Sequence, residues 1–87
     1  MRDLIRVRIS RAYFNLLCIP QGEARMVSLA WVGNCEIRMH DVSSAGAAKE
    51  TLFKMDYFDH DSELAIENRL CHDVEEGAAA FEAFEMR

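Results

Sequence analysis

The chain has 87 residues, of which 51% are hydrophobic and 29% charged, and its net charge at pH 7 is −5. This length fits one domain over residues 1–87, and the apolar content excludes a disordered chain. No run of about 20 apolar residues is present, as a membrane-spanning helix would require. The three cysteines are an odd set without close spacing. They predict reduced, buried thiols in a cytoplasmic protein rather than a disulfide framework.

The N-terminal part of the chain has the alternation of a β-strand. In residues 4–9, branched apolar side chains alternate with arginines, which is the period of a half-buried strand. Residues 12–19 form a second run rich in aromatic and branched side chains. It ends at Pro-Gln-Gly-Glu, residues 20–23, where proline and glycine suit a β-turn. We therefore expect two antiparallel segments before residue 24.

Two further strands follow this turn. The chain returns through residues 24–32 to Gly33-Asn34, a two-residue loop suited to a tight hairpin. Residues 35–42 alternate apolar and polar side chains again. The sequence thus predicts an antiparallel β-meander of three to four strands over residues 4–42.

The C-terminal part of the chain favours helices. Serines before residue 45 are suited to cap a helix over about 45–57. A second helix is expected over about 62–84, where apolar residues recur at spacings of three and four. Gly77 costs that helix about 1 kcal/mol relative to alanine, so it marks a kink or close packing. The predicted fold class is α+β, with both helices packed on one face of the sheet.

The predicted sheet carries apolar residues on both faces, and two helices can cover only one. Pairing the strands through the two turns yields a candidate self-association face that is rich in the residue types favoured at interface cores. Its members are Phe14, Leu16, Val27, Leu29 and Trp31. Two alternatives remain open for this face. Two copies pair through it as a homodimer, or the N-terminal strand and the helix at 45–57 fold over it.

Charge is distributed unevenly along the chain. Residues 1–38 hold six basic and three acidic residues, or +3, whereas residues 39–87 hold four basic and twelve acidic residues, or −8. A solvated helical face explains part of the acidic excess in residues 39–87. A surface that binds a basic protein explains this excess as well. The candidate partner-binding residues on this acidic surface are Glu67, Glu75, Glu76, Glu82 and Glu85.

The sequence lacks the motifs that carry catalytic chemistry. It has no glycine-rich phosphate loop, no Gly-x-Ser-x-Gly elbow and no Cys-x-x-Cys. A zinc site from Cys35, His40, Cys71 and His72 fits no standard ligand spacing. We therefore predict no catalytic residue, no metal site and no cofactor.

These features together favour a non-enzymatic protein-interaction module, a small regulator or inhibitor that docks on a basic surface of a larger protein. Immunity proteins and phage-encoded inhibitors of bacterial defence, such as anti-CRISPR proteins, are similar to it in size and charge, but no motif identifies a family. The alternative is a small nucleic-acid-associated protein that uses the N-terminal arginines to contact phosphates. The overall acidity and the lack of a nucleic-acid-binding motif argue against that alternative.

Overall fold

The computed structural model describes residues 2–20, 25–42 and 51–87. Its elements in chain order are α1 (Arg2–Leu17), β1 (Met26–Val32), β2 (Cys35–His40), β3 (Phe53–Asp59), β4 (Leu64–Cys71) and α2 (Val74–Glu85). The four strands form one antiparallel sheet in the order β1-β2-β3-β4. The protein is an α+β protein with an antiparallel meander. However, the predicted order of strands followed by two helices is wrong, because a helix comes first.

The N-terminal strands predicted within residues 4–19 are replaced by α1. Ile9, Ala12 and Leu16 are spaced by three and four, and each is at most 4% exposed in the core. This spacing places them on one side of a helix. A second set of apolar residues lies on exposed parts of the same helix: Leu4, Val7, Phe14 and Leu17. The two sets together give residues 5–9 the alternation that is typical of a strand.

The predicted hairpin at Gly33-Asn34 is confirmed. β1 and β2 pair antiparallel with Val32 opposite Cys35. Gly33 has a φ of +62°, a left-handed conformation that glycine adopts without steric cost. The turn predicted at residues 20–23 extends outside the described residues.

The helix predicted over 45–57 is wrong where the structure describes it, because residues 53–57 belong to β3. Phe53, Met55 and Tyr57 are buried, with at most 5% exposed. They alternate with side chains that point to the other face of the sheet, which is the strand period. Residues 45–50 of that prediction lie outside the described part of the chain.

The helix predicted over 62–84 is wrong in its first half and right in its second. Residues 64–71 form β4, and α2 begins at Val74. Asp73 is the N-cap of α2, and its Oδ1 accepts a hydrogen bond of 2.8 Å from the backbone N–H of Glu76. Such a cap satisfies a backbone donor that has no partner within the helix and so defines where the helix starts.

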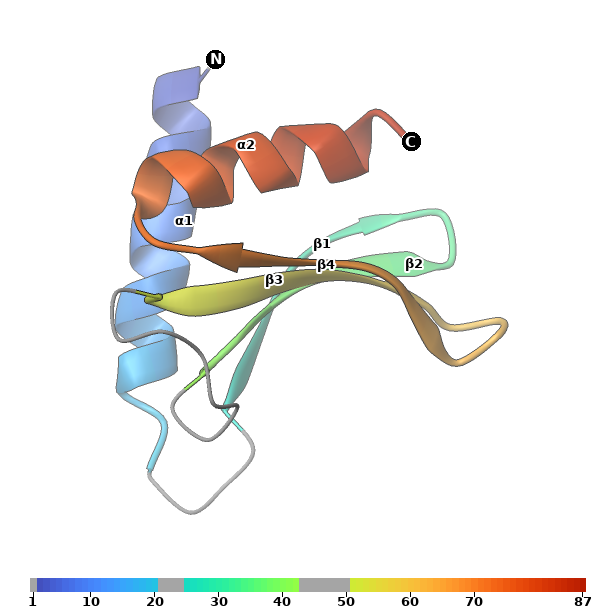
Figure 1. Ribbon diagram of the computed structural model, residues 1–87, viewed down its shortest axis with the longest axis horizontal. Helices are drawn as coiled ribbons and strands as arrows, with labels where there is room; N and C mark the ends of the chain where they lie inside the picture. The colour runs from blue at the N-terminus through green and yellow to red at the C-terminus, as the bar shows by residue number, and fades with distance from the viewer. Residues whose placement is uncertain (1, 21–24, 43–50) are drawn as a thin grey trace.

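The helices pack differently against the sheet (Figure 1). α2 lies along one face, whereas α1 runs past the end of the sheet and contacts both α2 and β1. The core lies between them, and its largest fully buried apolar side chains are Phe53, Phe81, Phe84, Ile9, Leu16, Ile37, Met39 and Met55. None of the described helices covers the opposite sheet face. Buried residues of both helices belong to the core on the same side of the sheet, so both helices pack on one sheet face, with α1 crossing its end.

Candidate functional site

The sheet face opposite α2 gathers charged and aromatic side chains. Residues directly opposite each other in an antiparallel pair point to the same face. The register pairs Trp31 with Glu36, Glu36 with Phe58, and Arg38 with Asp56. We call this surface the open face, and its members are Trp31, Glu36, Arg38, His40, Asp56, Phe58 and His60.

Asp56 is the centre of an ionic network on the open face. Arg38 donates two hydrogen bonds to it, from Nε to Oδ1 at 3.0 Å and from Nη2 to Oδ2 at 2.9 Å. His40 Nε2 lies 3.0 Å from Asp56 Oδ2. Burial raises the pKa of Asp56, but the hydrogen bonds from His40 and Arg38 outweigh it and lower the pKa to about 2. Asp56 therefore stays ionised at neutral pH and anchors both basic side chains.

Glu36 forms the second buried anchor of this face. The residue is 7% exposed, and its Oε1 lies 2.9 Å from His60 Nε2. Burial raises the pKa of Glu36. Hydrogen bonds with Ser28 and His60, together with the charge of Arg38, outweigh burial and hold this pKa below its ordinary value. Glu36 consequently fixes the orientation of the His60 ring.

Aromatic contacts lie above these ions. Trp31 stacks on His60 with ring centroids 4.7 Å apart, and Phe58 meets the same ring edge-on, also at 4.7 Å. The Arg38 guanidinium lies 4.1 Å from the centroid of Phe58, which is a cation–π arrangement. Trp31 is nevertheless 58% exposed. The face thus presents a large apolar ring to solvent in one fixed orientation.

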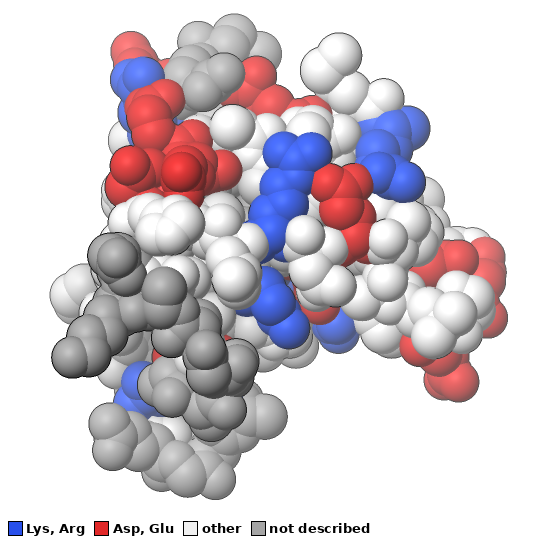
Figure 2. Space-filling view, in the orientation of Figure 1, with Lys and Arg blue, Asp and Glu red and all other residues white. Residues whose placement is uncertain are grey.

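An acidic turn borders this aromatic cluster. Asp59, Asp61 and Glu63 lie at or near the turn between β3 and β4. Asn34 Nδ2 donates to Asp61 Oδ2 at 3.0 Å, and the backbone N–H of His60 donates to the Asn34 carbonyl at 3.1 Å. These bonds join the two hairpin turns at one end of the sheet, where Figure 2 shows a group of acidic side chains.

The structure does not bring the predicted self-association face together. Phe14 is exposed on α1, whereas Leu16 of the same helix is 1% exposed in the core. Val27 and Leu29 of β1 pack against the core. Trp31 alone among the five lies on the open face. The strand predicted over residues 12–19 is wrong, because α1 extends to Leu17 and Phe14 and Leu16 are therefore not part of the sheet.

The acidic residues of α2 have local structural roles at its start. Glu75 forms an ion pair with Arg6 of α1. Glu76 Oε1 accepts a hydrogen bond of 2.7 Å from the His72 backbone N–H and lies 2.8 Å from His72 Nδ1. Both glutamates lie in the first turn of α2, where the helix dipole favours negative charge.

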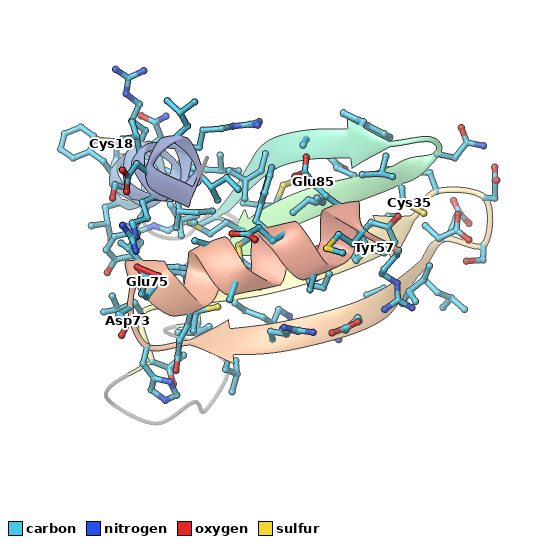
Figure 3. The ribbon with its side chains drawn as sticks, turned by 90° about the horizontal axis from the view of Figure 1, so that it is seen from above. Cys18, Cys35, Tyr57, Asp73, Glu75 and Glu85 are labelled. Carbon is cyan, nitrogen blue, oxygen red and sulfur yellow. The ribbon has the colours of Figure 1, made fainter. Side chains whose placement is uncertain are left out.

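The remaining predicted acidic residues lie elsewhere. Glu67 on β4 forms ion pairs with Arg69, at 2.7 Å, and with Arg87. Glu82 and Glu85 lie in the C-terminal half of α2. Figure 3 shows Glu75 and Glu85 at opposite ends of this helix. The predicted acidic residues are therefore spread over two elements rather than joined in one patch.

Two N-terminal arginines contribute to the packing of α1. Arg6 forms ion pairs with Asp3 and Glu75. Arg8 donates to the Leu29 carbonyl, and its guanidinium lies 5.0 Å from the Phe81 ring centroid. These contacts place Arg6 and Arg8 on a helix that packs on the core, and not on a strand.

The cysteines are free and differ in exposure. Cys71 is 1% exposed, and burial raises the pKa of its thiol to about 11, whereas Cys35 is half-buried and Cys18 is exposed. The predicted burial therefore holds for Cys71 only. Within residues 2–20, 25–42 and 51–87, no group of three or more histidine, cysteine or acidic side chains is arranged to hold a metal ion. No helix in these ranges is long and apolar enough to cross a membrane.

Comparison of the chain with protein-family models, with curated proteins and with solved structures finds no match. The geometry of the open face is therefore the basis for the proposed function. Glu36, Arg38 and His40 alternate with apolar residues in the sequence, but this alternation does not connect them to Asp56, Phe58 and His60. The signal in the sequence that indicates this connection is the alternation of residues 53–59, which is typical of a strand and not of a helix.

Proposed function

We propose that this chain is a non-enzymatic protein-interaction module that binds a larger protein through its open face. The observation that carries this proposal is Trp31, which is 58% exposed yet held by stacking on His60. Tryptophan, other aromatic residues and arginine are enriched at the energetic centres of protein interfaces. Arg38 and Phe58 supply both of the other types beside it.

The open face is ordered before any partner binds. Asp56 and Glu36 hold Arg38 and His60 through short hydrogen bonds. Ordering a mobile side chain during association costs about 0.5–1.5 kcal/mol. Because these side chains are already fixed, most of that cost does not arise when a partner binds Trp31.

The charge beside the cluster indicates the chemistry of the partner. Asp61 and Glu63 are exposed in the turn next to His60. A partner that fits therefore has an apolar pocket for Trp31 and basic residues around it. The proposed partner therefore still has a basic surface, as predicted from the sequence. The acidic residues of this chain that face it are those of the turn between β3 and β4. Electrostatic complementarity of this kind accelerates association and selects the partner.

A small regulator or inhibitor acting in the cytoplasm is the role that accords with such a surface. The size and charge similarity to immunity proteins and to phage anti-defence proteins, anti-CRISPR proteins among them, supports this role. In this assignment the histidines of the open face are structural parts of the network, His40 held by Asp56 and His60 held by Glu36.

Affinity capture from extracts of the native host tests the proposal. A protein retained by the wild-type chain should bind the Trp31→Ala variant at least about tenfold more weakly, because truncation of an interface centre costs about 2 kcal/mol or more. The matched control is Phe14→Ala, which removes an aromatic ring that is 68% exposed on α1. This variant should bind like the wild type.

Two further measurements complete the test: the identity of the captured molecule and the dependence of its binding on salt. Association with a basic protein should slow as salt rises, and slow further in Asp61→Lys. Equal binding by wild type and Trp31→Ala would remove the open face from consideration. Retention of nucleic acid instead of protein, with a shift in a gel assay, would favour the alternative that uses the arginines.

A further inference from the structure

The strand β4 is an edge of the sheet, and no helix or strand among the described residues pairs with its outer side. The strand order places β1 and β4 at the two edges. The β1 edge is approached by α1, because Arg8 donates to the Leu29 carbonyl. Along β4, every residue except Glu67 and Cys71 is exposed. Figure 3 shows β4 on the side of the sheet opposite β1. An edge strand offers backbone N–H and C=O groups with which another strand can pair.

The sequence of β4 is complementary to itself. When two β4 strands pair antiparallel about Asn68, residues at equal distances on either side of Asn68 face each other. Glu67 then faces Arg69 of the second copy, and Ile66 faces Leu70 of the second copy. Opposite charges and apolar pairs directly across a sheet each stabilise it by about 0.2–1 kcal/mol. Ile66 and Leu70 are 47% and 50% exposed in the single chain, so this contact would bury both.

Neighbouring registers lose this complementarity. Moving the centre by one residue places Glu67 opposite Glu67 of the second copy, or Arg69 opposite Arg69. Like charges directly opposite each other destabilise a sheet. The register centred on Asn68 is thus selected by charge as well as by apolar contact. Ile66 is the bulged residue opposite Tyr57 and Phe58 and borders the regular part of β4, whereas Glu67 and Arg69 lie in residues 67–71, which keep regular register with β3.

We propose that two copies of this chain pair through β4 about a two-fold axis at Asn68, joining their sheets into one continuous sheet. This axis is perpendicular to the sheet, so both open faces lie on the same side of the dimer. A partner with repeated sites can then engage both Trp31 side chains at once, which raises the overall avidity. The dimer itself does not depend on the proposed function, since its evidence is the β4 edge.

Sedimentation or light scattering with paired charge variants tests this dimer. The wild-type chain should associate reversibly to twice its monomer mass of 10.0 kDa. Arg69→Glu and Glu67→Arg should each weaken self-association at least about tenfold, because both symmetric contacts become like-charge contacts. Mixing the two variants should restore a dimer. In that heterodimer one chain has glutamate at both positions and the other has arginine at both, so every facing pair is again of opposite charge.

A disulfide at the axis tests the register. Residues directly opposite in an antiparallel pair have Cα atoms about 4.5–5.5 Å apart, which suits a disulfide. Asn68→Cys, in a Cys18→Ser background that removes the exposed native thiol, should form covalent dimers on mild oxidation. The control is Leu64→Cys, because residue 64 lies on the same strand but far from its own symmetry mate.

Three results would overturn the proposal. The first is a wild-type chain that remains a monomer at roughly 1 mM, which corresponds to association too weak to matter. The second is a mixture of the two charge variants without heterodimer, although each variant is folded by circular dichroism. The third is a dimer that Trp31→Asp splits and that Arg69→Glu leaves unchanged, which would place the contact on the open face.

Discussion

Asp56 shows how a single buried carboxylate organises the open face. Its side chain is 4% exposed and accepts two hydrogen bonds from Arg38, while His40 lies within hydrogen-bonding distance. A buried ion pair adds little stability over an apolar pair of the same shape, but removing one partner leaves an uncompensated charge. The network therefore contributes more to the arrangement of the face than to the stability of the fold.

The lowered pKa of Asp56 predicts acid sensitivity. Its pKa is about 2 in the folded chain, below its ordinary value of 3.8. The stabilisation is therefore complete above about pH 4 and is lost as pH falls through 2. The free energy of unfolding should drop by about 2 kcal/mol over that window from this residue.

Urea denaturation at several pH values measures this effect. Asp56→Asn should be less stable at pH 7, because Arg38 loses its charged partner, and its stability should depend less on pH between 4 and 2. Parallel pH profiles for the variant and the wild type would contradict the assignment of this titration to Asp56.

At the scale of elements, α2 depends on a close approach at Gly77. A Cβ atom at this position would lie 2.7 Å from Phe53 Cζ and 2.9 Å from Ile9 Cγ2. Such distances are shorter than van der Waals contact. The glycine therefore lets α1, β3 and α2 meet at one point, which accounts for a residue that is otherwise unfavourable inside a helix.

Gly77→Ala should destabilise the protein by about 1–3 kcal/mol despite the better helix propensity of alanine, because the core is overpacked. The control is Ala79→Gly, an exposed position on the same helix, which should cost about 1 kcal/mol through propensity alone. Thermal unfolding followed by circular dichroism measures both. A more stable Gly77→Ala variant would show that Phe53 and Ile9 can move aside.

The helix α1 shows why an element can be misassigned. Ile9 and Leu16 face the core, while Val7 and Phe14 are at least 50% exposed. A helix normally separates its apolar and polar residues onto different sides. Here apolar residues occupy two sides, so the helical period is hidden and the local alternation of residues 5–9 resembles a strand.

At the scale of the whole molecule, the charge asymmetry of the sequence is partly neutralised within the fold. Arg6 pairs with Glu75, and Arg38 pairs with Asp56, so basic residues of the first half meet acidic residues of the second. Arg25 pairs with Asp41 at 3.2 Å. The acidic turn beside His60 remains at the surface.

The core requires the first helix. Ile9, Ala12 and Leu16 are at most 4% exposed and complete the layer above the sheet. A chain lacking residues 1–17 should therefore lose cooperative folding, because deletion of large buried side chains costs about 2–5 kcal/mol each and small domains have little stability to spare. Phe14→Ala, which changes only an exposed side chain, should keep the wild-type transition.

Thermal scans in far- and near-ultraviolet circular dichroism distinguish the outcomes. The shortened chain is expected to show no sigmoidal transition. A cooperative transition with native near-ultraviolet signal would show that the sheet and α2 fold without α1.

The sequence by itself determines the α+β class, the hairpin at Gly33-Asn34 with Val32 opposite Cys35, and a helix over most of 74–84. These features depend on turn chemistry and on local apolar period, which neighbouring residues decide among themselves. Only the tertiary structure decides the rest. A spacing of four, as between Ile66 and Leu70, fits both a strand and a helix. Contacts between residues distant in the chain decide which apolar side of α1 is buried. Such contacts also decide whether residues 53–57 form a strand or a helix. The open face follows from those same contacts, because Asp56 reaches Arg38 only after β3 pairs with β2.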